Sequence, residues 1–277
     1  MENFLFVYLQ LLLLTLAVPI VLGVAVWAVQ RLFCHLVGAG IGRPLLLGVS
    51  AFSTLLREVG HMCACVIFFH RITDIKLLDL RDPDGELGFV EHSYNPRNPI
   101  ALLGNLFYAL FPVILGLLAV LVILLACFRG VIAPFFGEVA QLGELGGGFA
   151  DYARLTWDFL PRMFEDRSSG LFSAIVGAAL LLAIVLGIHV DPRELFDSFT
   201  GMLVYAVLAL AVTGVLVFPG ERVTRIALGG LRSFATGVTA LFLAVLLFAA
   251  ALAALGALVF LIRTLFGLDA PQLTRED

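Results

Sequence analysis

The sequence predicts an all-α integral membrane protein with about six transmembrane helices, and two observations lead to this fold class. Of the 277 residues, 61% are hydrophobic and only 14% are charged, and the mean hydropathy is +1.05. A water-soluble domain of this size has too small an interior to bury so much apolar surface, so a lipid bilayer is the expected solvent. The apolar residues also gather in runs of about 20, the length that a hydrocarbon core of about 30 Å requires.

The apolar runs give the predicted membrane spans. The first lacks an early basic region and a small-residue cleavage site, so we expect a retained helix rather than a signal peptide. The last is longer than one crossing needs, which indicates a tilted helix or one that extends beyond the lipid. The net charge of −4, without a basic stripe, argues against nucleic acid as a partner. The runs cover residues 4–30, 44–69, 100–128, 171–190, 198–218 and 233–266.

Two polar segments interrupt the spans. The first, residues 71–99, holds the alternating runs "DIKLLDL" and "GFVEHSY" on either side of "RDPDGE". Because this middle part is rich in turn-forming residues, we expect a β-hairpin after the second span. The second segment, 129–170, contains "FADYARLTWDFLPRMFEDRSS", whose aromatic and acidic residues recur at helical spacing. This pattern predicts an interfacial helix between the third and fourth spans.

The second span carries a candidate site in the stretch "REVGH", which contains Arg57, Glu58 and His61. Ionisable groups are rare here, because each costs at least about 2.5–3.5 kcal/mol at mid-bilayer. Positions 57 and 61 share a helix face, with 58 beside it. In zinc proteases the pattern H-E-x-x-H uses such a face to hold the metal with two histidines, while the glutamate activates water. E-x-x-H by itself has little specificity.

A second polar cluster, "LGIHVDPRELFDSFTGM" at residues 186–202, follows the fourth predicted span. Asp191 and Pro192 suit the N-cap and first turn of a new helix, and Glu194 then lies in that first turn. The simple interpretation is the start of an interfacial helix. In the functional alternative, His189, Asp191 or Glu194 is a third metal ligand brought against the second span.

The third span contains "NPIALLGNLFYALFPVILG", residues 98–116, in which Asn105 and Pro112 interrupt an apolar helix. Gly104 permits the close approach of another helix. Two interpretations stay open for these residues. Either they serve helix packing, or the Asn105 amide hydrogen-bonds to a site on the neighbouring helix.

Taken together, these motifs resemble the membrane-embedded zinc metalloproteases of the site-2 protease type, and more closely a bacterial group of M50-like integral membrane proteins. The family pattern is H-E-x-G-H in a helix, then a hairpin ending in G-x-V-x-H-S-Y-N, an I-G-N-x-F-x-x-x-x-P helix and a later acidic ligand. The likeness covers roughly residues 45–205. The stretches that match, in the same order, are "REVGH" (57–61), "GFVEHSYN" (88–95), "LGNLFYALFP" (103–112) and "DPRELFDSFTG" (191–201).

The resemblance implies a domain organisation and a location. A site-2-protease-like membrane core at residues 44–205 would follow an N-terminal transmembrane helix (1–43) and precede C-terminal transmembrane helices (206–277). The bacterial cytoplasmic (inner) membrane would be its location. Glu194 would occupy the acidic ligand position, and Asn105, Pro112 and His92 would serve core packing or substrate positioning.

One departure from the family pattern decides the predicted function. Arg57 stands where the first histidine ligand belongs, and a guanidinium is permanently charged and has no lone pair to give a metal. The ordinary three-ligand zinc site therefore cannot form. We expect Arg57 to supply the missing positive charge and to pair with Glu58 and with Glu194, joining the second span to the helix that begins near residue 192.

These residues predict a pseudoprotease without a cofactor that acts as a scaffold or regulatory subunit of a membrane complex. Its partners would be other membrane proteins, including an extended segment that pairs with the hairpin at residues 75–94. One alternative is an active zinc metalloprotease in which His61, Glu194 and either His189 or His92 hold zinc, with Glu58 as the base. A second alternative is a transporter or channel component whose pathway the charged residues line, although no pair of related halves is visible.

Overall fold

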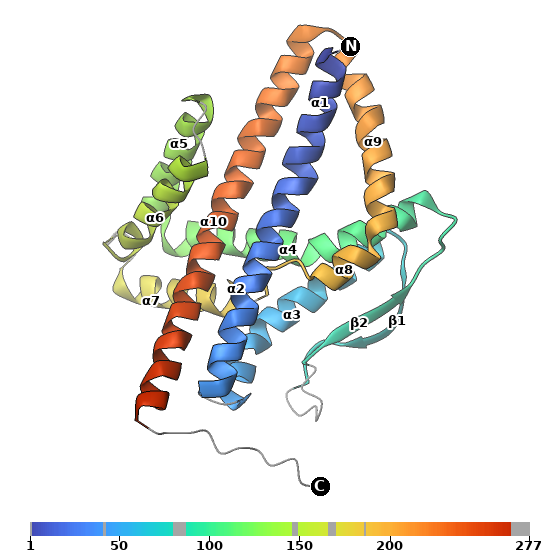
Figure 1. Cartoon of the computed structure of the whole chain (residues 1–277). Helices are drawn as coiled ribbons and strands as arrows, with labels where there is room; N and C mark the ends of the chain where they lie inside the picture. The colour runs from blue at the N-terminus through green and yellow to red at the C-terminus, as the bar shows by residue number, and fades with distance from the viewer. Residues whose placement is uncertain are drawn as a thin grey trace.

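The computed structural model describes residues 2–40, 43–79, 87–145, 149–165, 170–185 and 187–266. Within these ranges the chain is helical apart from one two-stranded sheet, which confirms the predicted all-α class with a hairpin (Figure 1). The elements, in chain order, are α1 (Glu2–Leu12), the π-helix η1 (Leu13–Ala17), α2 (Val18–Gly40), α3 (Arg43–Ile67), β1 (Arg71–Lys76), β2 (Phe89–Ser93), α4 (Pro99–Cys127), α5 (Arg129–Leu145), α6 (Phe149–Glu165), α7 (Leu171–Val185), α8 (Pro192–Asp197), α9 (Phe199–Val217) and α10 (Glu221–Leu265).

Four helical stretches of the described chain are long and apolar enough to cross a membrane, as expected of an integral membrane protein. The structure does not confirm six spans, because two of the six predicted runs are not among these stretches. The predicted fourth span contains the 15-residue α7, which is shorter than a crossing requires, and the predicted second span, α3, is not among the four. The four stretches are Phe4–Leu36, Pro99–Cys127, Phe199–Val217 and Arg222–Leu265.

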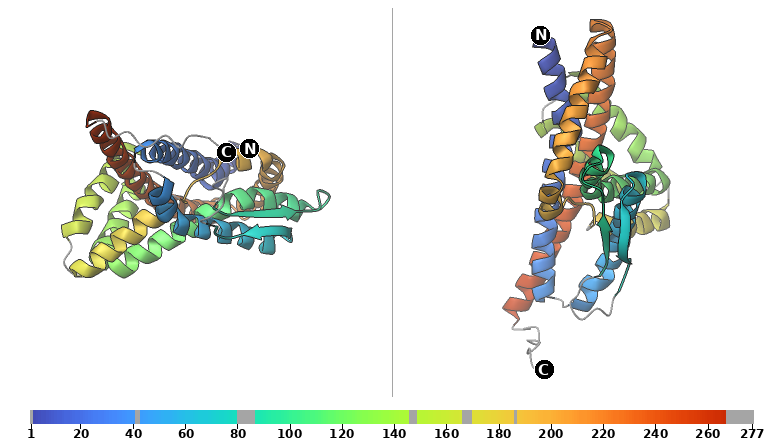
Figure 2. Two further views of the ribbon diagram at one scale, coloured as in Figure 1. Left: turned by 90° about the horizontal axis from the view of Figure 1, so that it is seen from below. Right: turned by 90° about the vertical axis from the view of Figure 1, so that its right-hand side faces the viewer.

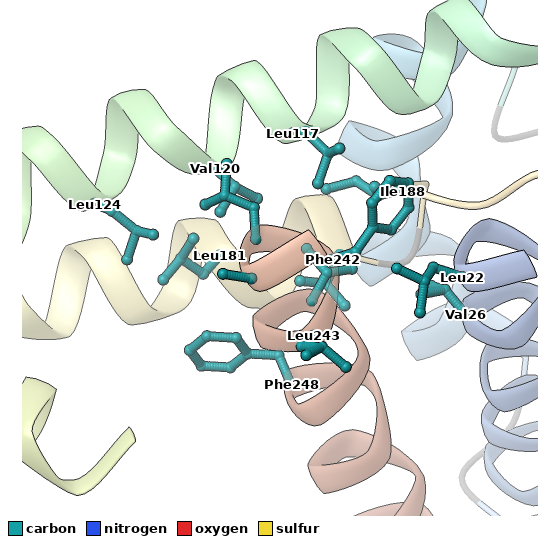
Figure 3. Packing of buried hydrophobic residues seen from close by; sticks show 14 of the residues in the cluster. Leu22, Val26, Leu117, Val120, Leu124, Leu181, Ile188, Phe242, Leu243 and Phe248 are labelled. Carbon is teal, nitrogen blue, oxygen red and sulfur yellow. The ribbon is translucent and has the colours of Figure 1, made fainter. Parts of the chain in front are cut away.

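The long helices pack as a crossed arrangement rather than a parallel bundle. α10 has 45 residues, about 68 Å of helix axis, and it lies alongside α2 (Figures 1 and 2). α4 runs across the α2–α10 pair, and α7 lies on the same side of this pair as α4 (Figure 1). Side chains of α2, α4, α7 and α10 meet in one apolar core, in which Val26, Val120, Leu181 and Phe242 are buried (Figure 3).

The polar segment 129–170 forms two helices, α5 and α6, and the stretch that predicts an interfacial helix forms α6. The Phe159 ring of α6 faces α5, and its centroid lies 4.4 Å from that of Phe135. Arg162 also donates a hydrogen bond of 2.8 Å to Glu138 across the pair. One face of α6 therefore packs on α5, whereas two other aromatic side chains of α6 are exposed.

The predicted hairpin is present. β1 and β2 are antiparallel, with Ile72 opposite His92 and Ile75 opposite Val90, and an irregularity follows Ile72. The predicted turn, "RDPDGE", lies outside the described residues. Val90 is buried whereas most of β1 is exposed, so the hairpin presents β1 outward.

A buried extended connection, residues 187–190, leads from α7 to α8. The Val190 amide donates to the Gly23 carbonyl of α2 at 3.2 Å. A Cβ atom at Gly187 would lie 2.6 Å from the Ser53 carbonyl oxygen of α3, so the chain passes too close for any side chain there. This path between α2 and α3 delivers α8 to the face of α3 that carries "REVGH".

Candidate functional site

The crossing of α3 and α4 positions the candidate site. A Cβ atom at Gly60 would lie 2.7 Å from the Pro112 Cα atom, so the missing side chain allows the two backbones to touch. His61 is the next residue on α3. Tyr108, one turn before Pro112 on the same face of α4, stacks on the His61 ring with the centroids 4.1 Å apart. Pro112 is thus a packing residue that sets the position of His61.

Arg57 and Glu194 form an ion pair between α3 and α8, as the sequence predicts. Arg57 Nη2 donates to Glu194 Oε1, so the contact joins one nitrogen to one oxygen. The side chains are 26% and 24% exposed. Asp191 caps α8 by accepting from the Arg193 amide at 2.8 Å, which confirms the predicted cap and places Glu194 in the first turn.

His61 completes the contact around Glu194. It is buried, and its Nδ1 lies 3.1 Å from the Tyr108 carbonyl oxygen. Because a carbonyl only accepts, Nδ1 carries the proton, and in the neutral ring Nε2 bears the lone pair. That Nε2 lies 3.6 Å from Glu194 Oε1. Two electron-rich atoms at this distance require a nearby cation, and the Arg57 guanidinium supplies it.

Glu58 lies beneath the hairpin and is 3% exposed. Its Cγ would be 3.1 Å from a Cβ atom at Gly88, so the start of β2 closes over it. Glu58 and Asp191 also act electrostatically on Arg57. Burial raises the pKa of Glu194 from its ordinary value, and the Arg57 charge opposes this rise. One guanidinium therefore compensates only part of the negative charge gathered here.

A stack of rings connects the site to the hairpin. The Tyr108 ring lies 4.2 Å from the ring of His92, and His61 stacks on Tyr108 at a similar distance, so Tyr108 stands between the two imidazoles. His70 stacks on His92 at 4.9 Å. Burial lowers the pKa of His92, the nearby His70 lowers it further, and the hydrogen bond to Asn105 opposes both. Asn105 thus bonds the hairpin, whereas the predicted alternative was a bond to a neighbouring helix.

Tyr108 and His70 belong to this arrangement although the sequence did not single them out. The Tyr108 hydroxyl donates to the Val90 carbonyl at 2.7 Å and so fastens β2 to α4. His70 Nε2 donates to the Ala101 carbonyl at 2.8 Å, next to the start of α4. The available signal for Tyr108 was its spacing of three residues from Asn105, which places both on one helix face.

The residues of the alternative zinc site do not fit a metal ion in this arrangement. His92 is separated from His61 by the Tyr108 ring, so the two cannot share an ion. His189 is buried and acts electrostatically on His61. Within the described ranges, no three His, Cys, Asp or Glu side chains come together closely enough to hold a metal. Arg57, a cation, also contacts the carboxylate that would have to bind the ion.

Compared with protein-family models, curated proteins and solved structures, the chain matches none of them.

Proposed function

We propose that this protein is a proteolytically inactive, site-2-protease-like membrane protein that acts as a scaffold or regulatory subunit of a complex in the bacterial inner membrane. The observation that carries the proposal is the ion pair of Arg57 with Glu194. In the motif pattern these are the positions of the first histidine ligand and of the acidic ligand. Here a permanently charged guanidinium and a carboxylate occupy these positions and form an ion pair with each other.

The chemistry of Arg57 supports a lost reaction. Hydrolysis by a zinc protease depends on an ion that binds water and lowers its pKa to about 7, so that a neighbouring base can complete the activation. A guanidinium supplies positive charge but accepts no electron pair, so it cannot bind a water in this way. Glu58 keeps the motif position of the base, is buried and acts electrostatically on Arg57.

The hairpin supports a role in binding other proteins. A two-stranded sheet leaves the outer edge of each strand without a strand neighbour, and β1 is mostly exposed. An extended segment of another membrane protein can add to such an edge through backbone hydrogen bonds. Tyr108 and His92 hold β2 against α4, so the partner would meet an edge that the helices already support.

Zinc content of the purified protein tests the proposal. We expect no bound zinc in the wild type and about one zinc per chain in Arg57→His, because this change adds a second imidazole one helical turn from His61. Arg57→Lys is the matched control: it also replaces the guanidinium but adds no metal ligand at neutral pH. The double variant Arg57→His/His61→Ala should lose the zinc again. Stoichiometric zinc in the wild type would overturn the proposal in favour of an active metalloprotease.

A further inference from the structure

An elongated apolar cavity lies away from the Arg57 site, between η1, α4, α9 and α10. Its volume is about 490 Å³, within the range of small-molecule sites. The part of α4 that lines it runs from Leu106 to Leu121, which is about 22 Å of helix axis. Such a shape suits one extended hydrocarbon chain better than a compact ligand.

The inner wall of the cavity is buried and its mouth is exposed. Leu106 and Phe242 are at most 1% exposed, whereas Leu118 is 54% and Phe234 is 70% exposed. Helices α4, α9 and α10 are each long and apolar enough to cross a membrane, so we expect lipid hydrocarbon rather than water at this mouth. An apolar cavity of this kind stays dry and accepts apolar ligands.

The hydroxyl groups of Thr15 and Tyr205 form a polar site in the wall of the cavity. The Thr15 hydroxyl, in the π-helix η1, lies 2.6 Å from the Leu11 carbonyl oxygen. Because a carbonyl only accepts, Thr15 is the donor in this hydrogen bond. The 2.5 Å contact between Thr15 Oγ1 and the Tyr205 hydroxyl must therefore use the Tyr205 proton. The Tyr205 oxygen then retains lone pairs but no free hydrogen. A ligand group at this point has to be a hydrogen-bond donor, such as an alcohol, and not a carboxylate or a phosphate diester.

We infer that this cavity binds the single hydrocarbon chain of a neutral lipid whose hydroxyl group donates to Tyr205. The ligand class is that of long-chain alcohols and monoacylglycerols. The inference is independent of the proposed loss of protease activity, because Arg57 and Glu194 pair with each other and neither lines the cavity. Binding would hold η1, α4, α9 and α10 together around one lipid molecule.

The test is photolabelling of the full chain in phosphatidylcholine nanodiscs, with hexadecanol that carries a diazirine near its methyl end. Mass spectrometry should map the label to residues 106–121 of α4 and to the facing part of α10. Unlabelled hexadecanol should compete more strongly than hexadecyl methyl ether, which lacks the donor, by up to about tenfold, the value of one hydrogen bond. Tyr205→Phe should remove this preference and leave the ring in place.

Two further variants distinguish ligand binding in the cavity from general contact of the helices with lipid. Leu110→Trp fills the cavity from its buried wall and should abolish competable labelling. Leu203→Trp makes the same change on α9, at a side chain that is 53% exposed and does not line the cavity, and should leave labelling unchanged. If Leu110→Trp fails to fold, Tyr205→Phe still decides the question. Equal competition by the alcohol and the ether in the wild type, or label spread evenly over all lipid-facing helices, would overturn the inference.

Discussion

Arg57 sits where two carboxylates and an imidazole converge, and its charge accounts for the way those groups are arranged. It contacts Glu194 directly and interacts electrostatically with Glu58. His61 directs its lone pair toward the same carboxylate at 3.6 Å. Without a cation this collection would be unfavourable in an environment of low dielectric constant.

Replacing Arg57 by alanine should therefore destabilise the fold. Breaking a buried pair from one side costs about 3–5 kcal/mol, and we expect the lower end of this range because a quarter of each side chain is exposed. Thermal unfolding in detergent measures the effect. Arg193→Ala, which removes an exposed cation from α8, is the control and should change the melting temperature little. The same melting temperature for wild type and Arg57→Ala would contradict the role of the pair.

His92 predicts a pH dependence of stability. Its folded-state pKa lies below the ordinary value of about 6.5, chiefly because it is buried. Between these two values the unfolded chain binds more protons than the folded chain, so the free energy of unfolding increases with pH across this window. Stability should accordingly fall as the pH drops below about 6.5.

The variant His92→Gln isolates this contribution because glutamine does not titrate and keeps an amide to bond Asn105. Melting temperatures of the variant and the wild type should be compared from about pH 5 to pH 8, on both sides of the ordinary histidine pKa. The difference between the two should shrink as the pH falls. A constant difference would show that His92 does not contribute to the pH dependence.

At the scale of the elements, the crossing of α3 and α4 decides the position of His61. The crossing depends on Gly60, whose missing side chain lets α3 touch the backbone at Pro112. A second glycine, Gly201 of α9, meets α4 in the same way, with its Cβ position 2.5 Å from the Leu102 carbonyl oxygen. Helices α3 and α9 thus both approach the first half of α4.

Gly60→Ala should separate α3 from α4 and destabilise the protein by about 1–3 kcal/mol, the usual cost of overpacking. Gly214→Ala on α9 is the matched control because nothing lies within 4 Å of its Cβ position. It should be neutral or stabilise the helix by up to about 1 kcal/mol. Equal melting temperatures for the two variants would mean that the crossing tolerates a methyl group.

At the scale of the whole molecule, α2 near the start of the chain and α10 near its end belong to the same core. Leu22 and Val26 of α2 pack with Phe242 of α10 and with Ile188 of the connection to α8 (Figure 3). The Gly23 carbonyl also accepts a hydrogen bond from Val190, three residues before Arg193. Helix α2 therefore supports the segment that leads to Glu194.

Expressed without residues 1–40, the rest of the chain should be aggregated or degraded, because the apolar side chains that face α2 would lose their cover. Co-expression of residues 1–40 as a separate fragment should restore a monodisperse complex in size-exclusion chromatography. A fragment with Val26→Asp should not restore it, since Val26 is fully buried. A stable, monodisperse chain without residues 1–40 would contradict a shared core.

Local patterns in the sequence were sufficient to predict several features of this protein. The apolar runs predict membrane helices, the alternating runs around a turn predict the hairpin, and Asp191–Pro192 predicts the start of α8. Charge chemistry alone predicts that Arg57 needs a carboxylate partner. These features depend on neighbours in the chain or on the cost of a lone charge in the membrane, and both can be read from the order of residues.

Only the tertiary structure decided which of these elements meet. The crossing at Gly60 and Pro112 places Tyr108 between His61 and His92, and the buried connection 187–190 brings Glu194 to Arg57 across 137 positions. The division of 129–170 into α5 and α6 and the short α7 also depend on packing. Such contacts join residues that are distant in the chain, so no periodicity in the sequence encodes them, and the shapes of the packed helices decide them instead.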